Sequence, residues 1–383
     1  MSSCLSYLIL TLLVAPLRSD KTLETADPKP ILVFILVRHG DRTPVHKLPN
    51  DPHKNLWTQG YGELTQYGSE QLRFLGKFIR QSYPDLLSTT YLPASSFDES
   101  FFRSSATNRT LMSAYSFIRG LYDQESTTVG YPPVYSIPLD IDHLLKMSSN
   151  CTQFITSYQN FMESPEVTLL AEQFSETLNH FQQRFCNRAP WPQLSDALYL
   201  NAKCFVNFNS FSLAQIAVMF PENPTPVGRL RVGWKICDPV GVWVLHQLPW
   251  PHWLTSEIAQ QCARMLDFKH YIRFSTPALT RLRGGPLVAH MLRLFRTRAN
   301  LELSRSSSAE QKKLAKPLPL VAPTSGLEVV GSGQRLIAYF AHDSTLAAVL
   351  SHLGIFNRYI ALFHSHKRKE VAAILCDLMP AFQ

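Results

Sequence analysis

The sequence predicts an α/β protein whose mainly parallel sheet is flanked by helices and carries a smaller α-helical cap subdomain. Continuous apolar runs at residues 31–37 and 335–341 favour strands that are buried on both faces, as in a parallel sheet. Each run ends in a histidine and charged residues, and a helical pattern follows it, which is the order of a βα unit. A long stretch with helical spacing, residues 153–185, predicts the cap, which we place roughly at 142–280.

The composition fits one large enzyme domain. The chain has 383 residues, 45% of them hydrophobic, which is enough for a sizeable core with an inserted subdomain. The formal net charge is +8, but lysine and arginine are spread along the chain and no nucleic-acid-binding motif is present. We therefore expect no nucleic-acid partner, and we interpret the positive charge as a field that attracts a small anionic substrate.

The first 20 residues are typical of a signal peptide. Residues 5–17 are mostly apolar and small residues lie near a cleavage point, although no lysine or arginine precedes the apolar stretch. A buried N-terminal helix is the alternative. No later stretch approaches the ~20 apolar residues that a membrane helix needs. We therefore expect no transmembrane anchor, and a secretory-pathway protein in the lysosomal lumen or outside the cell.

Cysteine usage agrees with a secretory route. Apart from Cys4 in the leader, the chain has an even set of cysteines, which indicates disulfide bonds whose pairing cannot be read from the sequence. No two of them have the spacing of zinc ligands, which disfavours a zinc site. Sequons for glycosylation begin at Asn108 and Asn150. We expect a glycan at Asn150 and interpret Asn108 as a buried helix cap.

The first predicted strand leads into the most informative stretch of the chain. Directly after residues 31–37 comes the sequence Arg38-His39-Gly40-Asp41-Arg42-Thr43-Pro44. Open α/β sheets bind ligands beyond the carboxyl ends of their strands, and two guanidinium groups so close together suit a phosphate group. A basic surface turn is the alternative, but a pattern with so many specified positions is rare by chance. Residues 46–61 predict a long loop that lines the entrance to this site.

The next elements alternate between helix and strand. Large apolar residues recur at helical spacing in residues 65–81, with Thr65 as the N-cap. Two phenylalanines before Arg103 predict a second strand at residues 101–105, and a helix through residues 111–120 follows it.

The second half of the chain is less regular. Residues 201–235 have no periodicity that we can assign, whereas residues 258–274 and 286–299 predict helices. Residues 304–333 are rich in serine, lysine, proline and glycine, which is typical of a surface loop or disordered insert.

The last strand of the predicted sheet ends in His342-Asp343, where a helix over residues 344–353 begins. The start of a helix offers free backbone N–H groups and a partial positive charge, which together form a natural anion site. Asp343 could equally be a simple N-cap. A single His-Asp pair after a strand is a weak signal, but it becomes a strong one beside the first motif.

These two blocks together resemble the signature of the histidine acid phosphatases, in particular the lysosomal and prostatic type in clade 2 of the histidine phosphatase superfamily. The first block matches Arg-His-Gly-x-Arg-x-Pro, and Ala341-His342-Asp343-Ser344-Thr345 matches the family's Ala-His-Asp-Thr-Thr. The resemblance implies a phosphoglycerate mutase-like core within a domain over 28–383, and a homodimer. It thins in the divergent segments 201–235, 304–333 and 357–383.

The family also has a block like Arg-Ser-Thr-Asp-x-x-Arg-Thr, which Arg103 and Arg109 match. The resemblance assigns phosphate binding to Arg103, and we interpret Arg109 as a solvated or capping residue. Ala106 stands where the family has an aspartate, so one supporting carboxylate is absent.

The resemblance implies hydrolysis of phosphate monoesters through a phosphohistidine intermediate, without a metal or other cofactor. The site residues that we expect are the nucleophile His39, the proton donor Asp343, and the phosphate ligands Arg38, Arg42, Arg103 and His342. The neighbouring guanidinium groups disfavour the imidazolium form of His39 and keep its nucleophilic form available. Because Asp343 must be protonated when substrate binds, an acidic pH optimum is favoured.

Two other functions remain open from the sequence. A phytase- or sugar-phosphatase-like member of the same superfamily would prefer a polyphosphorylated or sugar-phosphate substrate. A catalytically impaired secreted protein would bind phosphoesters without turning them over. Ala106 and the loss of resemblance after Gly354 favour the impaired protein, whereas the two intact motifs favour an enzyme.

Overall fold

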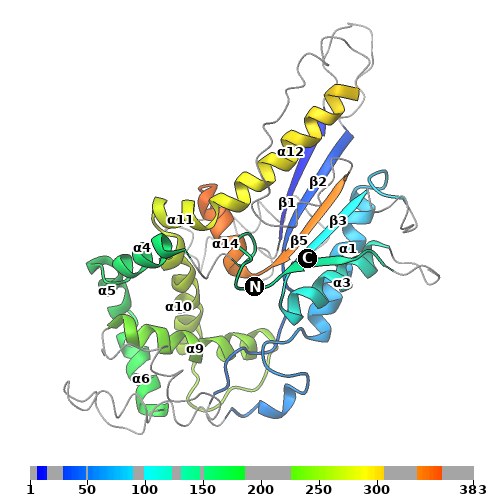
Figure 1. Ribbon diagram of the computed structural model, residues 1–383. Helices are drawn as coiled ribbons and strands as arrows, with labels where there is room; N and C mark the ends of the chain where they lie inside the picture. The colour runs from blue at the N-terminus through cyan, green and yellow to red at the C-terminus, as the bar shows by residue number, and fades with distance from the viewer. Residues whose placement is uncertain are drawn as a thin grey trace, which may run out of the picture.

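The computed structural model describes residues 7–14, 29–48, 51–88, 99–122, 131–146, 151–185, 226–305 and 334–355. Its sheet has the strand order β1-β2-β5-β3-β4 (Figure 1). The strands are β1 (Tyr7–Val14), β2 (Lys29–Arg38), β3 (Ser100–Ser105), β4 (Val134–Ile137) and β5 (Leu336–Ala341). All neighbours pair in parallel except β1, which lies antiparallel to β2. The prediction of a mainly parallel α/β sheet is thus confirmed.

Helices make up most of the remaining described structure. They are α1 (Gln66–Ser82), α3 (Asn108–Leu121), α4 (Thr152–Met162), α5 (Pro165–Glu172), α6 (Ser175–Phe185), α9 (Pro226–Leu245), α10 (Ser256–Phe274), α11 (Pro277–Arg283), α12 (Gly285–Arg305) and α14 (Asp343–His352), with a short 3-10 helix η1 (Lys54–Leu56). The predicted N-cap of α1 is confirmed, because the Thr65 side chain accepts a hydrogen bond from the Gly68 N–H.

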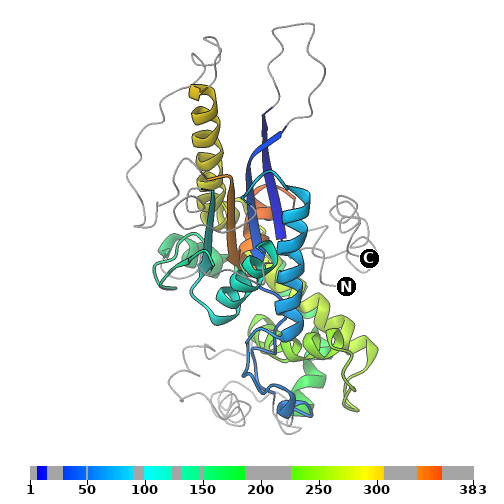
Figure 2. The ribbon, with the colours of Figure 1, turned by 90° about the vertical axis from the view of Figure 1, so that its right-hand side faces the viewer.

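The continuous apolar runs are explained by helices on both faces of the sheet (Figure 2). Alternate residues of β2, β3 and β5 pack against α1 and α3 on one face, and the intervening residues pack against α12 and α14 on the other. Both sets are almost fully buried, so residues 32–37 of β2 and 336–341 of β5 are apolar on both faces. This burial on two sides removes the alternating pattern that an exposed sheet face would show.

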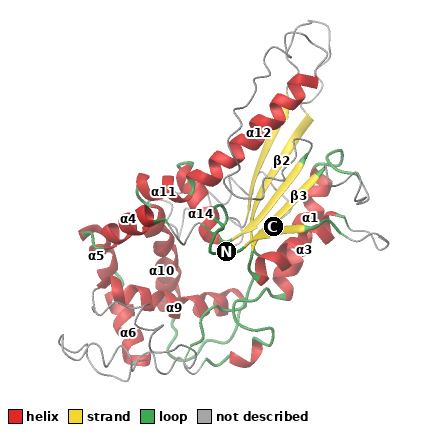
Figure 3. Ribbon diagram, in the orientation of Figure 1, coloured by secondary structure: helices red, strands yellow, loops and turns green. Residues whose placement is uncertain are grey.

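A third hydrophobic core is formed mainly by helices and contains no strand residue. We call α4, α5, α6, α9 and α10 the helical cap; they lie together at one end of the sheet (Figure 3). Side chains of α5, α6, α9 and α10 form a buried cluster that is separate from both faces of the sheet. The boundaries 142–280 stay a prediction. The separate core explains why the sequence of this region has helical periodicity and lacks the pattern of a strand.

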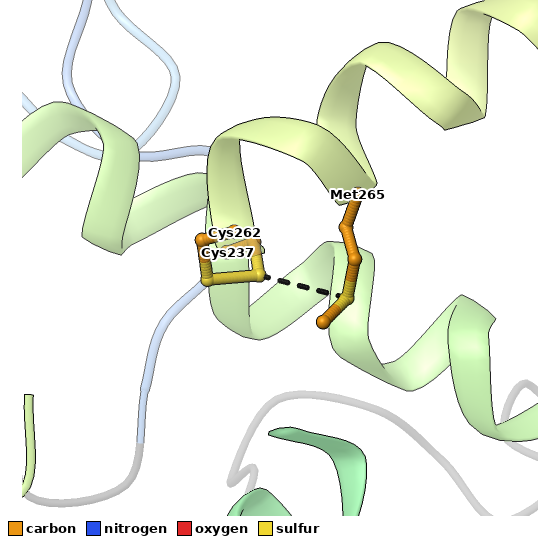
Figure 4. The surroundings of a disulfide bond; sticks show 3 residues. All are labelled: Cys237, Cys262 and Met265. Carbon is orange, nitrogen blue, oxygen red and sulfur yellow. Dashed lines mark hydrogen bonds between the residues drawn. A yellow bond between two sulfur atoms is a disulfide. The ribbon is translucent and has the colours of Figure 1, made fainter. Parts of the chain in front are cut away.

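One disulfide bond crosses the helical cap. Cys237 of α9 is bonded to Cys262 of α10, and the Cys237 sulfur also lies 4.0 Å from the Met265 sulfur (Figure 4). The prediction of disulfide bonding is therefore met for one pair, and this pair ties together the two long helices of the cap. Cys151 is exposed and unpaired in the structure, while Cys4, Cys186, Cys204 and Cys376 lie outside the described residues.

The N-terminal segment differs from the expectation. Residues of the predicted leader form β1, which pairs with β2 from Tyr7 opposite Val37 to Val14 opposite Lys29. The sequence reasoning considered a leader or a buried helix, and neither includes a strand at this edge. A mostly apolar segment with β-branched residues can pair with an open strand edge as well as form a helix. Cleavage of a leader stays a prediction.

Three further expectations can be compared with the structure. Asn108 is exposed and begins α3, whereas Thr107 is the N-cap residue, so the interpretation of Asn108 as a buried cap was wrong.

The part of segment 201–235 that is described forms the start of α9. Asn150 and the segment 357–383 lie outside the described residues, as does most of 304–333. Of the helices described, none is long and apolar enough to cross a membrane.

Candidate active site

The two sequence motifs meet because their strands are parallel neighbours. Arg38 at the end of β2 lies opposite Ala341 at the end of β5, and the His39 N–H donates to the Ala341 carbonyl over 3.0 Å. The next residues of both strands therefore leave the sheet at the same point, as expected for a ligand site of an α/β protein. The rings of His39 and His342 lie edge to face with centroids 5.6 Å apart.

His39 is held with one ring nitrogen free. Its Nδ1 lies 2.8 Å from the Gly40 carbonyl oxygen, which can only accept, so Nδ1 carries the proton and donates it. The Nε2 lone pair is then available for a reacting atom. Burial lowers the pKa of His39 well below its usual range, and the charges of Arg38 and Arg109 lower it further. Both effects favour the neutral form of the imidazole below its usual pKa, and the role of His39 as nucleophile stays a prediction.

Close backbone contact fixes the loop that carries His39. A Cβ atom at Gly40 would lie 2.2 Å from the Gly68 carbonyl oxygen of α1, so a larger residue would push the loop away from the helix. The Gly40 N–H donates to Ser113 of α3. Asp41 accepts a hydrogen bond from the Thr65 hydroxyl over 2.6 Å. Both helices on this face of the sheet therefore hold the loop in place.

The helical cap holds the same loop from the other side. Asp238 of α9 accepts a 2.7 Å hydrogen bond from Arg42 Nη2. Its second carboxylate oxygen accepts from the backbone N–H groups of Val45 and His46. His246 Nε2, at the end of α9, lies 2.8 Å from Asp41 Oδ2. Burial raises the pKa of Asp238, but the charge and hydrogen bond of Arg42 lower it by more, so the net pKa is lowered. The side chain is therefore a carboxylate that orients Arg42.

Arg103 and Arg109 have different surroundings in the structure. Arg103 is buried, its Nη2 donates to Asp142 over 2.7 Å, and its guanidinium lies over the Tyr339 ring. Arg109 is half-buried, and its Nη2 lies 3.4 Å from His342 Nδ1. The Nε atoms of Arg38, Arg103 and Arg109 are all buried without a hydrogen-bond partner among the described residues. The geometry thus brings Arg109 beside His342, and phosphate binding by Arg103 stays a prediction.

His342 has protein partners on both ring nitrogens. Arg109 Nη2 can only donate, so Nδ1 of His342 accepts, and Nε2 then donates to Ser105 Oγ over 2.9 Å. Burial lowers the pKa of His342 to about 4, and the charge of Arg109 acts in the same direction. A neutral His342 thus orients the Arg109 guanidinium beside His39. Direct contact of His342 with phosphate, which the resemblance implies, stays a prediction.

Asp343 is the first residue of α14 and the most exposed group of the site, with 44% of its side chain accessible. Its Oδ2 lies 3.9 Å from Arg38 Nη2 and 3.9 Å from Nε2 of His270 in α10. Enclosure by protein atoms raises the pKa of Asp343, but His270 and Arg38 outweigh it, and the net pKa lies well below its usual range. Without a bound anion the group is therefore a carboxylate. A phosphate dianion beside it would act in the opposite direction.

Sequence reasoning brought together five of its six site residues. The structure gathers Arg38, His39, Arg42, His342 and Asp343, and it adds Arg109, Asp238, His246 and His270. Arg109 had a signal, since it lies in the third matching block. Asp238, His246 and His270 of the cap had no such signal. Each is a single polar residue that lies far along the chain from the motif residue it contacts. Among the described residues, no cluster of three histidine, cysteine or acidic side chains could hold a metal ion.

Comparison with known proteins agrees with this architecture. The family model described as "Histidine phosphatase superfamily (branch 2)" matches residues 31–370. The chain is 28% identical to lysosomal acid phosphatase from Xenopus laevis, over 85% of this chain and 62% of that protein. It is 26% identical to human prostatic acid phosphatase, over 85% of this chain and 69% of the relative.

Solved structures of phytases are also similar to this chain. The phytase of Klebsiella sp. ASR1 superposes with a TM-score of 0.49 at 15% identity, covering 84% of this chain and 72% of the phytase. The curated relatives are longer than the matched region, since the chain spans 62% of the length of the Xenopus protein. The match of the family model over most of the chain, together with both motifs at one sheet edge, shows that the chain belongs to branch 2 of the histidine phosphatase superfamily.

Proposed function

We propose that this protein is an acid phosphatase that hydrolyses phosphate monoesters through a phosphohistidine intermediate on His39. The observation that carries the proposal is the state of His39: its Nδ1 is bound to the Gly40 carbonyl, its Nε2 is free, and its pKa is lowered. A neutral imidazole whose second nitrogen is fixed by a hydrogen bond is suited to nucleophilic attack.

In the first step, Nε2 of His39 attacks the phosphorus atom and the bond to the ester oxygen breaks. Arg38, Arg42 and Arg109 bind the phosphoryl oxygens, and the buried Nε donors of Arg38 and Arg109 gain an acceptor when phosphate is present. Protonated Asp343 gives its proton to the leaving oxygen, so that the alcohol departs as a neutral molecule. The imidazole now carries the phosphoryl group.

In the second step, water attacks the phosphorus atom and the bond to Nε2 breaks. The Asp343 carboxylate accepts a proton from this water, which restores both His39 and the proton donor. The partial exposure of Asp343 gives water access to this point. The arginine side chains supply the charge stabilisation that a magnesium ion supplies in other phosphoryl-transfer enzymes, so the proposed reaction needs no metal.

The pH dependence follows from Asp343. The proton-donating form must be present when the leaving group departs, and His270 and Arg38 keep the group ionised in the free protein. Binding of the substrate dianion favours the protonated form, and acid favours it as well. We therefore propose an acidic optimum, which also fits the names of the relatives, lysosomal and prostatic acid phosphatase. By the same comparison we place the protein in the secretory pathway, in the lysosomal lumen or outside the cell.

The test compares the wild-type protein with His39→Ala on p-nitrophenyl phosphate in acid, about pH 5. Loss of the covalent route lowers kcat by at least ~10³-fold. Quenching of the wild-type reaction in alkaline denaturant, in which phosphohistidine is stable, should also leave label on the protein when the substrate is radiolabelled in its phosphoryl group, and the label should be absent in His39→Ala. His252→Ala, an exposed histidine between α9 and α10, is the control for the loss of an imidazole.

Two outcomes would contradict the proposal. Wild-type turnover by His39→Ala would remove the phosphohistidine mechanism. A wild-type protein that binds phosphoesters but releases no phosphate at any pH would support the alternative of a catalytically impaired binding protein.

A further inference from the structure

His270 is a titratable residue of the helical cap whose imidazole faces the proton donor of the site. Its Nε2 lies 3.9 Å from Asp343 Oδ2, although the two residues come from different helices and different subdomains. Its Nδ1 is buried and has no hydrogen-bond partner in the described part of the chain. Asp343 is therefore the polar group toward which this side chain is directed, and neither sequence motif includes His270.

Packing between two helices fixes this approach. Phe274 at the end of α10 packs against Ala347 and Ala348 of α14 in a small buried cluster of its own. His270 lies four residues before Phe274, and Asp343 lies four residues before Ala347. Residues four apart in a helix lie on the same face, one turn away. The Phe274 contact therefore places His270 and Asp343 opposite each other, one turn closer to the phosphate site.

The charges around this pair are mostly positive. Asp343 is faced by Arg38, His39 and Arg42 from β2 and its loop, and by His270 from α10. His270 is faced by Lys269 and Arg273 of its own helix, by Arg38, and by Asp343 as the nearby acid. Arg109 of α3 also acts on Asp343, and Arg283 of α11 acts on Arg273. A proton on His270 is thus stabilised mainly by Asp343, and the two groups titrate as a pair.

We propose that His270 is a positioning residue for Asp343, through which the helical cap sets the strength of the acid that protonates the leaving group. The inference rests on the proposed function. A positive charge on His270 stabilises the Asp343 carboxylate. Protonated Asp343 is then a stronger acid, but this protonated form is present only at lower pH. Burial of the imidazole lowers the pKa of His270 to about 4, so this effect operates in acid, where the enzyme is proposed to work.

Two substitutions with opposite charge consequences test this role. His270→Gln removes the ionisable group, and His270→Lys makes the positive charge permanent. We measure kcat and kcat/KM against pH with p-nitrophenyl phosphate, whose leaving group departs easily, and with an alkyl phosphate, whose leaving group needs the proton. The pH at which activity falls as pH rises should move up by about half to one unit in His270→Gln and down in His270→Lys. Both shifts should be larger with the alkyl phosphate.

Arg264→Gln is the matched control. Arg264 is on the same helix, is exposed, and lies over the Phe174 ring of the cap, so its loss removes a positive charge from α10 without touching Asp343. Its pH profile should equal that of the wild type. Asp343→Asn supplies a second control, because the difference between the two His270 variants should vanish when the partner no longer ionises.

Several results would overturn the inference. Shifts in the same direction for both variants, or no shift in either, would exclude control of Asp343 by His270. A change in KM for both substrates with an unmoved pH profile would assign His270 to phosphate binding instead. If His270→Gln unfolds at lower temperature than Arg264→Gln, His270→Asn replaces it as the neutral variant. Failure of the proposed function is recognised separately, since then His39→Ala would be as active as the wild type.

Discussion

The sheet edge and the helical cap contribute to one site in different ways. The sheet edge supplies its residues in two short motifs, and hydrogen bonds between neighbouring parallel strands bring them together. The cap supplies single residues, Asp238, His246 and His270, from two helices. The edge therefore carries the groups that we propose to contact the substrate, whereas the cap pairs with Arg42, contacts Asp41 and faces Asp343.

This division has a physical cause. A residue at the end of a strand is placed by the register of the sheet, which shifts only in steps that turn side chains to the opposite face. A residue on a cap helix is placed by how well that helix packs in its own core. Changes at the sheet edge should therefore affect chemistry or global folding, while changes in the cap should affect local stability, affinity and pH dependence.

The largest effect is expected from Arg103 and Arg109, the two arginines of the third matching block. Arg103→Met leaves the buried Asp142 carboxylate without its partner, which lowers the free energy of unfolding by about 3–5 kcal/mol. Arg109→Met removes a half-buried donor and lowers kcat/KM by ~10²–10³-fold with little change in stability. Urea unfolding and steady-state kinetics separate the two outcomes.

The double variant Arg103→Met/Asp142→Leu is the control, because it removes both charges and should recover part of the stability. If Arg103→Met folds as well as the wild type but loses affinity for phosphate, then Arg103 is the phosphate ligand that the resemblance implied.

The disulfide bond of the cap gives the next largest effect. The Cys237→Ser/Cys262→Ser variant loses a cross-link over a sequence separation of 25 residues, which lowers the free energy of unfolding by about 2–4 kcal/mol. Because Asp238 follows Cys237 directly, the KM should rise as well. Cys151→Ser, at an exposed free cysteine, should change neither quantity. Equal unfolding midpoints for the double serine variant and the wild type would show that the helix packing alone holds the cap.

A smaller effect tests His290, a buried histidine of α12 that contacts β5 of the sheet. Burial lowers the pKa of His290 to about 4, with Arg103 acting in the same direction, and its Nε2 lies 2.8 Å from the Tyr339 hydroxyl. An unfolded chain takes up this proton near pH 6.5. Between about pH 6.5 and 4 the unfolded state therefore binds more protons, so acid lowers the free energy of unfolding. The share of His290 is on the order of 1–3 kcal/mol.

Chemical unfolding of His290→Gln at neutral and acid pH measures this share. The variant should lose less stability on acidification than the wild type, and His252→Gln at an exposed position serves as the matched replacement. An unchanged dependence on pH would mean that His290 does not contribute to acid sensitivity.

The smallest effect is expected for the link between the cap and Arg42. Asp238→Asn keeps the shape of the side chain but removes the charge that pairs with Arg42 over 2.7 Å. We expect KM for p-nitrophenyl phosphate to rise by about 10-fold, with kcat less affected, because Arg42 binds phosphate without its orienting partner. Glu257→Gln, an exposed acid on α10, is the control. A fall in kcat with constant KM would show that Asp238 acts on the chemical step.

Much of the fold could be read from the chain. The strands β2, β3 and β5, the helices α1, α3, α10, α12 and α14, and the N-cap Thr65 were all predicted, because burial on two faces and helical spacing leave local patterns. The strand β1 and the first turns of α9 were not, since the same apolar segments suit several structures. The sequence analysis interpreted Arg109 as a solvated or capping residue and did not predict its contact with His342, because that contact joins α3 to the end of β5.

The sequence by itself determined the first motif of the candidate site, because Arg38, His39 and Arg42 lie close together in the chain directly after a buried strand. It likewise determined that His342 and Asp343 follow a second strand of this kind. Only the tertiary structure decided that Arg109 contacts His342, that Asp238 pairs with Arg42 and that His270 faces Asp343. The reason is that a motif records neighbours along the chain, whereas these contacts depend on how separate helices and strands pack.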